Sequence, residues 1–300
     1  MYPAEFSYLR AGSVSEALDA LADGESDDDL KILAGGQSLL PMMKLRLATP
    51  SVLLDIGGLT SLAAVDPEAG RVGALATYRS LQRDARLAGR FPAMADALSV
   101  LADPQVRARG TIGGAIAHGD PAADLPAVLL ALDATLTVAR SGGSRTVALD
   151  DFLRGVFDTD LADDELITEV VIPPAAAGQA YEKFEQSASH LPLAGVCAAV
   201  EVGAAGAITG ARVAVTGVAG RVFRARAVEA ALVGQEPVDA VLDGAAAQVR
   251  DGAPRPLEDI HASGSFRLHL AEVLAQRALR RALMRAGESS LQVSVTPSGG

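Results

Sequence analysis

Two pairs of adjacent glycines constrain what this chain can fold into more than any other feature of its sequence. Gly35-Gly36 follows a short apolar run, and Gly113-Gly114 follows a threonine, Thr111, by two positions. A backbone bend without Cβ atoms can turn several N–H groups toward one point and lets a ligand come close. The sequence therefore predicts two bends, each suited to a phosphate and together suited to a pyrophosphate.

The neighbours of the glycines add polar groups to both predicted bends. Gln37 and Ser38 follow the first pair, and Ser38 is placed to cap a following helix whose N-terminus would face the same anion. The Thr111 hydroxyl suits a phosphate oxygen at the second pair. Neither segment matches a Walker loop or the Rossmann Gly-x-Gly-x-x-Gly fingerprint. An isolated diglycine bend is more often a tight turn without a ligand, and that interpretation stays open for each pair alone.

Composition and charge exclude several classes of protein. The chain has 300 residues, 49% of them hydrophobic, which favours two or three globular domains. Its net charge of -11 argues against nucleic acid as the main partner. Cys197 is the only cysteine, so the chain alone builds neither a disulfide nor a cysteine-ligated iron–sulfur cluster. Because no apolar run could cross a bilayer and the N-terminus has no secretion signal, a cytoplasmic protein is expected.

Apolar periodicity indicates three regions of different character. The first 60 residues resemble βα segments, the next region runs to the stop at Pro173-Pro174, and the remainder changes to an antiparallel pattern. The expected helices cover residues 14–21, 38–47, 79–86, 91–102, 124–132, 224–233, 238–249 and 266–284. The expected strands cover residues 31–34, 52–56, 63–65, 71–75, 135–138, 166–172, 181–184, 194–202 and 207–215. Four arginines late in the last helix are interpreted as charges that favour its C-terminal end: Arg277, Arg280, Arg281 and Arg285.

Few residues suggest acid–base or nucleophilic catalysis. His118 is a lone histidine, which is more often a structural hydrogen-bonding residue than a catalytic one. Asp120 and Asp124 can form a carboxylate pair, although Asp124 is first expected as a helix N-cap or as an acceptor for a ligand hydroxyl. Arg107 and Arg109 lie either on a solvated helix face or close enough to the second glycine pair to neutralise phosphates. A redox cofactor that brings its own reactivity would explain this lack of catalytic groups.

Five motifs together carry a resemblance to a known family. They are Ala34–Leu39, Thr111–Gly114, Asp120–Asp124, Asp164–Pro173 and Tyr181–Phe184. Their order and separation resemble the FAD-binding medium subunit of the molybdenum hydroxylases, a family that includes the medium subunit of carbon monoxide dehydrogenase and the FAD-binding subunit of xanthine dehydrogenase. The resemblance implies an α+β fold of the vanillyl-alcohol-oxidase (PCMH) type. Its FAD-binding domain would cover residues 1–173, with subdomains at about 1–60 and 61–173. A C-terminal α+β domain at 174–288, with a three-stranded antiparallel sheet and helices, and a flexible tail at 289–300 would follow.

The resemblance also implies which residues surround FAD. The residues that it places there are Leu33, Ala34, Gly35, Gly36, Gln37, Ser38, Leu101, Thr111, Ile112, Gly113, Gly114, Ala115, Asp124, Ile167 and Lys183. The segments 33–38 and 111–115 would hold the pyrophosphate, Asp124 would meet ribityl or ribose hydroxyls, and the Ile167 backbone would contact the adenine. Leu101, on the inward face of its predicted helix, would line the flavin pocket.

Two positions in this set leave questions open. Lys183 is either a cation at the flavin edge or a surface lysine on a strand, and the sequence does not favour one over the other. Many relatives have Asn where this chain has Ala115. That change removes a side-chain amide but no backbone donor, so FAD binding is expected to survive it.

The function implied by the resemblance is electron transfer within a larger enzyme. In such enzymes a large subunit with molybdopterin cytosine dinucleotide oxidises the substrate, and a small subunit with two [2Fe–2S] clusters passes the electrons to this FAD. The expected assembly is a heterotrimer doubled to an (LMS)2 heterohexamer, with an external electron acceptor. The alternatives are a stand-alone FAD oxidoreductase of the same fold and a flavin-free assembly scaffold.

Overall fold

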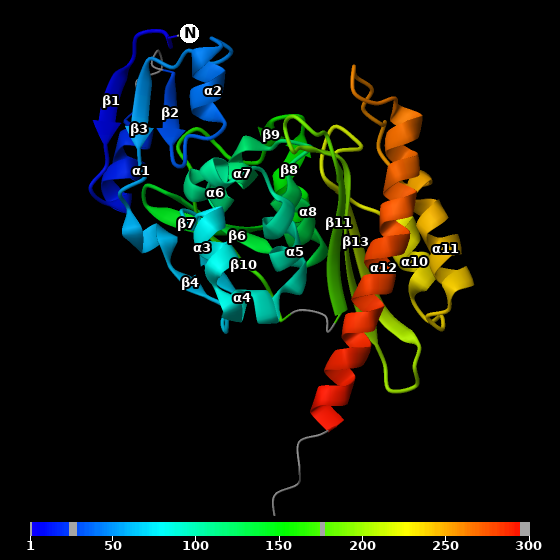
Figure 1. Cartoon of the computed structure of the whole chain (residues 1–300). Helices are drawn as coiled ribbons and strands as arrows, with labels where there is room; N and C mark the ends of the chain where they lie inside the picture. Colours follow the sequence, from blue (N-terminus) through cyan, green and yellow to red (C-terminus); the bar gives the residue numbers. More distant parts are fainter. Residues whose placement is uncertain (1, 24–28, 175–177, 295–300) are drawn as a thin grey trace, which may run out of the picture.

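The computed structural model describes residues 2–23, 29–174 and 178–294, and Figure 1 shows three units that follow one another along the chain. Each unit is built on its own sheet, of three, five and four strands in turn. The N-terminal unit, in blue, lies beside the central unit, and the third sheet stands between the central helices and the C-terminal helices. This arrangement agrees with the expected α+β fold.

The N-terminal unit is a small parallel sheet with two helices. Its strands are β1 (Ser7–Arg10), β2 (Leu30–Leu33) and β3 (Val52–Asp55), with β3 in the middle. Helix α1 (Val14–Ala22) begins where the Ser13 hydroxyl accepts a bond from the Glu16 N–H. Helix α2 (Leu39–Lys44) is shorter than expected, because Arg46 takes a left-handed conformation (φ 58°) directly after the C-cap residue.

The central unit packs several short helices against an antiparallel sheet. The strand order is β4 (Val65–Asp66), β5 (Arg71–Gly73), β10 (Leu166–Val171), β6 (Thr135–Arg140) and β7 (Gly143–Ala148). The helices are α3 (Tyr78–Arg83), α4 (Ala85–Arg90), α5 (Pro92–Val100), α6 (Pro104–Arg109), α7 (Ile112–His118), α8 (Asp124–Ala131) and α9 (Leu149–Phe152). A ribbon of β8 (Leu153–Gly155) and β9 (Asp158–Thr159) and a 3₁₀ turn, η1 (Thr60–Ala63), complete the unit. Every residue of α8 is buried, so this helix forms the centre of the domain.

The C-terminal unit is an antiparallel sheet with both faces covered. Its strands β11 (Gly178–Glu185), β12 (Pro192–Val202), β13 (Ile208–Thr216) and β14 (Phe223–Arg224) lie in sequence order. The sheet has four strands rather than the expected three, because Phe223 and Arg224 pair with the end of β13. The helices are α10 (Arg226–Leu232), α11 (Asp239–Ala247) and α12 (Gly264–Ser294), with a 3₁₀ turn, η2 (Gln248–Arg250).

The side chains of β12 explain how this sheet joins the two domains. Val196 and Ala198 point into the core formed with α10–α12, whereas Cys197 and Ala199 belong to the core of the central unit. Alternation along a strand sends neighbouring side chains to opposite faces. The C-terminal sheet is therefore packed directly on α5 and α8.

Helix α12 is longer than the sequence pattern indicates. It continues to Ser294, beyond the expected end at 284 and into the segment 289–300 that was expected to be a flexible tail. Pro297 is the first residue after Gly264 that cannot extend a helix, since proline lacks the N–H donor. Residues 295–300 lie outside the described residues. None of the described helices combines the length and the apolar character that crossing a membrane requires.

Candidate functional site

The two glycine pairs, 78 residues apart along the chain (113 − 35), belong to segments that touch each other. A Cβ atom on Gly35 would lie 2.2 Å from the Arg109 carbonyl oxygen and 3.0 Å from the Gly110 Cα atom. No other residue fits such a contact between two backbones. The fold thus brings the end of β2 against the segment that leads into Thr111.

The first pair forms the expected bend. Gly36 has a φ of +75°, a conformation that L side chains rarely adopt. Within the part of the chain that the structure describes, the backbone N–H groups from Gly35 to Ser38 have no protein acceptor. Gln37 instead folds its amide back onto the Gly35 carbonyl at 3.3 Å. Ser38 does not cap α2 as predicted, because its side chain bonds to none of the helix N–H groups.

The second pair is not a bend, and that prediction is wrong. Gly113 and Gly114 lie in the first turn of α7, which Thr111 caps through a bond from the Gly114 N–H to its hydroxyl at 3.2 Å. The Gly113 N–H donates to the Ala74 carbonyl at 2.8 Å. A Cβ on Gly113 would lie 2.5 Å from the Ala74 Cβ, so the glycine is needed for close packing.

The other residues of this segment are placed by the same packing. The Ile112 side chain is fully buried, and its N–H donates to the Ala76 carbonyl. Ala115 is half-buried and follows the glycines within α7. Arg107 donates to the carbonyls of Leu101 and Ala102 at 2.7 Å each, so it holds the loop after α5. Leu101 is buried but lies just beyond α5, which ends at Val100, and not on the face of a helix as predicted.

A second group of predicted residues meets at the domain interface. Asp124 is the first residue of α8 and not its N-cap, which is Ala123. Its carboxylate accepts a bond from the Tyr181 hydroxyl at 2.7 Å and lies 3.2 Å from the Lys183 Nζ atom. Lys183 also donates to the Val100 carbonyl at 3.0 Å. Its side chain is only 3% exposed, so the interpretation as a surface lysine is wrong.

Burial dominates the electrostatics of this group. It raises the pKa of Asp124 to about 6, although Lys183 and the Tyr181 hydroxyl both favour the ionised form. Burial also raises the pKa of Tyr78 and of Tyr181 above the ordinary value, and the Asp124 charge adds to both shifts. Asp124 can therefore exchange a proton near neutral pH, whereas both tyrosines stay protonated hydrogen-bond donors.

A cavity of about 590 Å³ opens beside the buried lysine. Ala102 and residues of α5 line one side, and β11 with His190 lines the other. Predicted site residues thus lie at two places. Gly35, Gly36, Gln37 and Ser38 meet the segment before α7, while Asp124 and Lys183 meet at the wall of this cavity.

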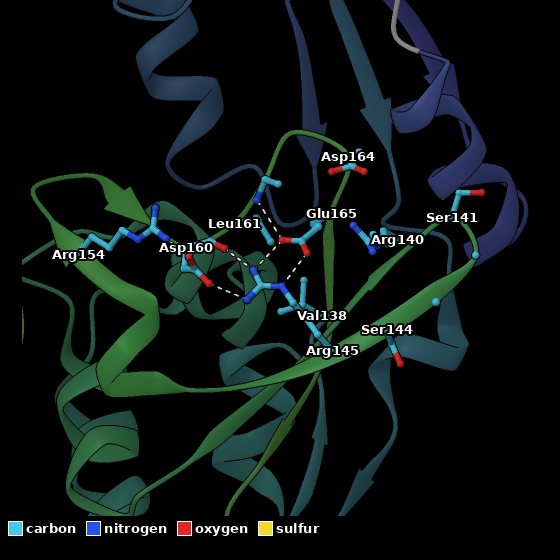
Figure 2. A pocket seen from close by; sticks show the side chains of 13 residues that line it. Val138, Arg140, Ser141, Ser144, Arg145, Arg154, Asp160, Leu161, Asp164 and Glu165 are labelled. Carbon is cyan, nitrogen blue, oxygen red and sulfur yellow. Dashed lines mark hydrogen bonds and ion pairs between the residues drawn. The ribbon is translucent and has the colours of Figure 1, made fainter.

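A larger cavity of about 700 Å³ lies against the loop before β10 (Figure 2). Arg145 fixes this loop through bonds of 2.7 Å to each carboxylate oxygen of Glu165 and 2.6 Å to Asp160. Glu165 also accepts from the Ala162 N–H at 3.0 Å. Ile167 follows on β10, buried beside Val138 of β6. The ion pairs thus hold the segment from which Ile167 was predicted to contact an adenine.

The interdomain clamp, formed by Asp96, Arg281 and Arg285, was missed by sequence reasoning. Arg285 donates to both Asp96 carboxylate oxygens at 2.8 and 3.0 Å, and Arg281 pairs with the same carboxylate. The Tyr181 N–H donates to Asp96 at 3.1 Å. The two arginines act across the interface in the middle of α12, so their interpretation as charges at a helix end is wrong.

Comparison with known proteins agrees with this architecture. The model described as the FAD binding domain in molybdopterin dehydrogenase matches residues 4–175, and the CO dehydrogenase flavoprotein C-terminal domain matches residues 179–282. The chain is 38% identical to the glyceraldehyde dehydrogenase medium chain of Sulfolobus acidocaldarius, over 93% of this chain and 99% of the relative. It is 37% identical to the nicotine 6-hydroxylase medium subunit of Paenarthrobacter nicotinovorans, over 93% and 96%.

Solved structures give the same result. Carbon monoxide dehydrogenase from Hydrogenophaga pseudoflava superposes with a TM-score of 0.89 at 37% identity, covering 95% of this chain and 99% of the other. Quinoline 2-oxidoreductase from Pseudomonas putida 86 superposes with a TM-score of 0.88 at 34% identity, with the same coverage. Both are oxidoreductases with a chain of this fold.

Proposed function

Because this chain belongs to the family of FAD-binding medium subunits of molybdenum hydroxylases, we propose that it carries electrons through FAD within a larger complex. The electrons would arrive from [2Fe–2S] clusters on a partner subunit and leave to an external acceptor. The residues of this chain would bind and tune the flavin, which supplies the redox chemistry.

One observation carries the proposal at the level of residues. The N–H groups from Gly35 to Ser38 have no protein acceptor among the described residues, and Gly35 lies against the Arg109–Gly110 backbone. Gly35, Gly36 and Gln37 are half-buried and Ser38 is exposed. Backbone donors at such a place need a hydrogen-bond acceptor, and a diphosphate supplies several acceptor oxygens. This arrangement fits the pyrophosphate of FAD.

The remaining contacts follow from that placement. We assign the pyrophosphate to residues 33–38, with Thr111, Ile112, Gly113, Gly114 and Ala115 closing the opposite side. The backbone of Ile167 would meet the adenine, and Asp124 would accept from ribityl or ribose hydroxyls. Leu101 would line the flavin pocket and Lys183 would place its cation near the flavin edge.

The partners follow from the same family membership. We propose a small subunit with the iron–sulfur clusters and a large subunit with molybdopterin cytosine dinucleotide, doubled to an (LMS)2 heterohexamer in the cytoplasm. This chain has one cysteine, Cys197, which is fully buried. No group of three or more His, Cys, Asp or Glu side chains among the described residues is arranged to hold a metal ion. Clusters carried by other subunits are consistent with both facts.

The test is the visible spectrum of the purified chain, followed by isolation of its complex. We expect a yellow protein, or a colourless one that turns yellow with one FAD per chain, and co-purification with iron- and molybdenum-containing subunits. A chain that cannot be loaded with FAD would instead be an assembly scaffold. Yellow protein that oxidises an organic substrate without other subunits would be the stand-alone oxidoreductase.

A further inference from the structure

We propose that a row of four titratable side chains, from His190 at the surface to Asp124 in the interior, carries protons to the flavin side of the domain interface. The two intermediate members are Lys183 and Glu185. The destination of the protons rests on the proposed function, whereas the row itself is a property of this chain.

The four side chains are in contact from end to end. The Asp124 carboxylate lies 3.2 Å from the Lys183 Nζ atom, and that atom lies 3.4 Å from the Glu185 carboxylate. The other Glu185 oxygen lies 2.9 Å from the Nδ1 atom of His190. The two oxygens of Glu185 thus connect the lysine on one side to the histidine on the other.

The inner pair of side chains is buried and the outer pair is partly exposed. The side chains of Asp124 and Lys183 are 5% and 3% exposed, whereas those of Glu185 and His190 are 37% and 44% exposed. His190 and Glu185 line the 590 Å³ cavity, so water reaches the outer end of the row. The inner end is closed off from solvent by Tyr181 and α8.

Each member can take part in proton exchange. The imidazole of His190 has two ring nitrogens, so it can take up a proton at one of them and release a proton from the other toward Glu185. Its contact holds the pKa of Glu185 below the ordinary value. Burial brings the pKa of Asp124 to about 6, so the inner carboxylate is protonated below about pH 6 and can donate. A lysine that touches two carboxylates can pass a proton to one while it receives a proton from the other.

The other charged groups around the row have partners or fixed roles. The Asp103 carboxylate caps α6, and the bonds from the Val106 and Gln105 N–H groups, with a smaller contribution from His190, hold its pKa below the ordinary value. Tyr78 and Tyr181 face Asp124. Across the cavity, Asp96 and Glu182 both pair with Arg281. The row is thus a separate set of contacts from the interdomain clamp.

The chemistry of a flavin requires such a supply. Reduction of an isoalloxazine ring by two electrons takes up at least one proton at its N5 atom. The electrons would come from the partner's iron–sulfur donor, and the proton would enter at His190 and leave from Asp124. Each residue of the row gives up one proton for each proton that it receives, so none of the four is changed after one proton has passed.

The first experiment needs no flavin. Time-resolved infrared spectroscopy of the apoprotein after mixing with D2O at pH 5 follows the protonated carboxyl of Asp124, whose band Asp124→Asn identifies. We expect His190→Gln and Glu185→Gln to slow its exchange by about 10²-fold, the lower range for a positioned acid–base group. Glu182→Gln is the matched control on the same strand, and it should leave the rate unchanged. Equal exchange rates in the unmodified protein, His190→Gln, Glu185→Gln and Glu182→Gln would show that the row is not a proton path.

The second experiment uses the FAD-loaded chain. Proton uptake is followed with a pH indicator dye while light reduces the flavin through a photosensitiser. We expect His190→Gln and Glu185→Gln to slow proton uptake by about 10²-fold, and Glu182→Gln to leave the uptake rate unchanged. Unchanged uptake in His190→Gln, with slowed exchange in the apoprotein, would show that the row does not serve the flavin. A chain that takes up no FAD would refute the proposed function and the destination, but not the exchange result.

Discussion

The two glycine pairs consist of the same two residues, yet the structure uses them for opposite purposes. Gly35 and Gly36 form a bend on the N-terminal unit, half-buried, with N–H groups that no described residue accepts. Gly113 and Gly114 lie inside α7, where the N–H groups are bonded to Ala74 and Thr111. The first pair leaves backbone donors for a ligand, and the second lets a helix pack closely on the core.

This difference separates binding from stability. A side chain added at the second pair enters a core that is close-packed and cannot yield without cost. A side chain added at the first pair pushes apart two segments that meet at a half-buried seam. Substitutions in the second pair should therefore act mainly on folding, and those in the first mainly on FAD binding.

The largest effect is expected for Gly113→Ala. The new Cβ would lie 2.5 Å from the Ala74 Cβ and 2.8 Å from the Ala74 carbonyl oxygen. Because the Ala74 backbone is fixed by its N–H bond to the Thr168 carbonyl of β10, we expect the free energy of unfolding to fall by about 3 kcal/mol, the upper range for overpacking. Urea denaturation followed by circular dichroism measures this loss. The control is Gly244→Ala in α11, where nothing lies within 4 Å and alanine should stabilise the helix by about 1 kcal/mol. If Gly113→Ala loses less free energy of unfolding than Gly35→Ala does, the expected difference between the two glycine pairs is contradicted.

Next in size is Gly35→Ala, which should act on the cofactor more than on the fold. Its Cβ would lie 2.2 Å from the Arg109 carbonyl oxygen, so the two segments must separate. We expect the affinity for FAD to fall about 100-fold, equivalent to about 2.7 kcal/mol, with a smaller loss in the free energy of unfolding. Quenching of flavin fluorescence measures the affinity. Gly89→Ala, in open space on α4, should leave the affinity unchanged and raise the free energy of unfolding by about 1 kcal/mol. Unaltered affinity in Gly35→Ala would place the pyrophosphate elsewhere.

The sequence is sufficient to predict the order of the three units and the bend at Gly35-Gly36. It does not predict that Gly113-Gly114 is helical, because two glycines together have a poor intrinsic preference for a helix. The cap at Thr111 and the close contact with Ala74 override that preference. Ala74 is 39 residues away along the chain (113 − 74), so no local pattern contains this contact.

The residues at the domain interface show the same limit of prediction from sequence, because their contacts join distant parts of the chain. Asp124 and Lys183 are 59 residues apart, and Asp96 and Arg285 are 189 apart. A lysine on a strand with alternating polar residues has the pattern of a surface position, and only the packing of β11 on α5 and α8 buries it. Residue types were thus enough to select Asp124 and Lys183 as candidates. Their contact with each other, which influences the Asp124 pKa, can be found only in the folded structure.

Gly36→Ala should have an intermediate effect on the free energy of unfolding. It tests whether glycine is needed at position 36 because of its positive φ or because a Cβ atom has no room there. The φ of +75° costs an alanine about 1–2 kcal/mol. The nearest atom to its Cβ is a Leu40 side-chain carbon at 3.0 Å, which can move aside. We expect a loss of about 1 kcal/mol in the free energy of unfolding, and Gly36→Asn should recover part of it since asparagine tolerates this region. Equal losses in the two variants would mean that space, and not φ, requires the glycine.

The smallest effects come from the two hydroxyl residues beside the glycines, which the sequence treats alike. Thr111→Val keeps the shape but removes the cap of α7, and should lower the free energy of unfolding by about 1 kcal/mol. Ser38→Ala removes no cap bond, so its stability should stay unchanged. Thr111→Ser restores a hydroxyl and is the matched control. If Ser38→Ala lowers FAD affinity while stability stays constant, the Ser38 hydroxyl acts on the ligand and not on α2.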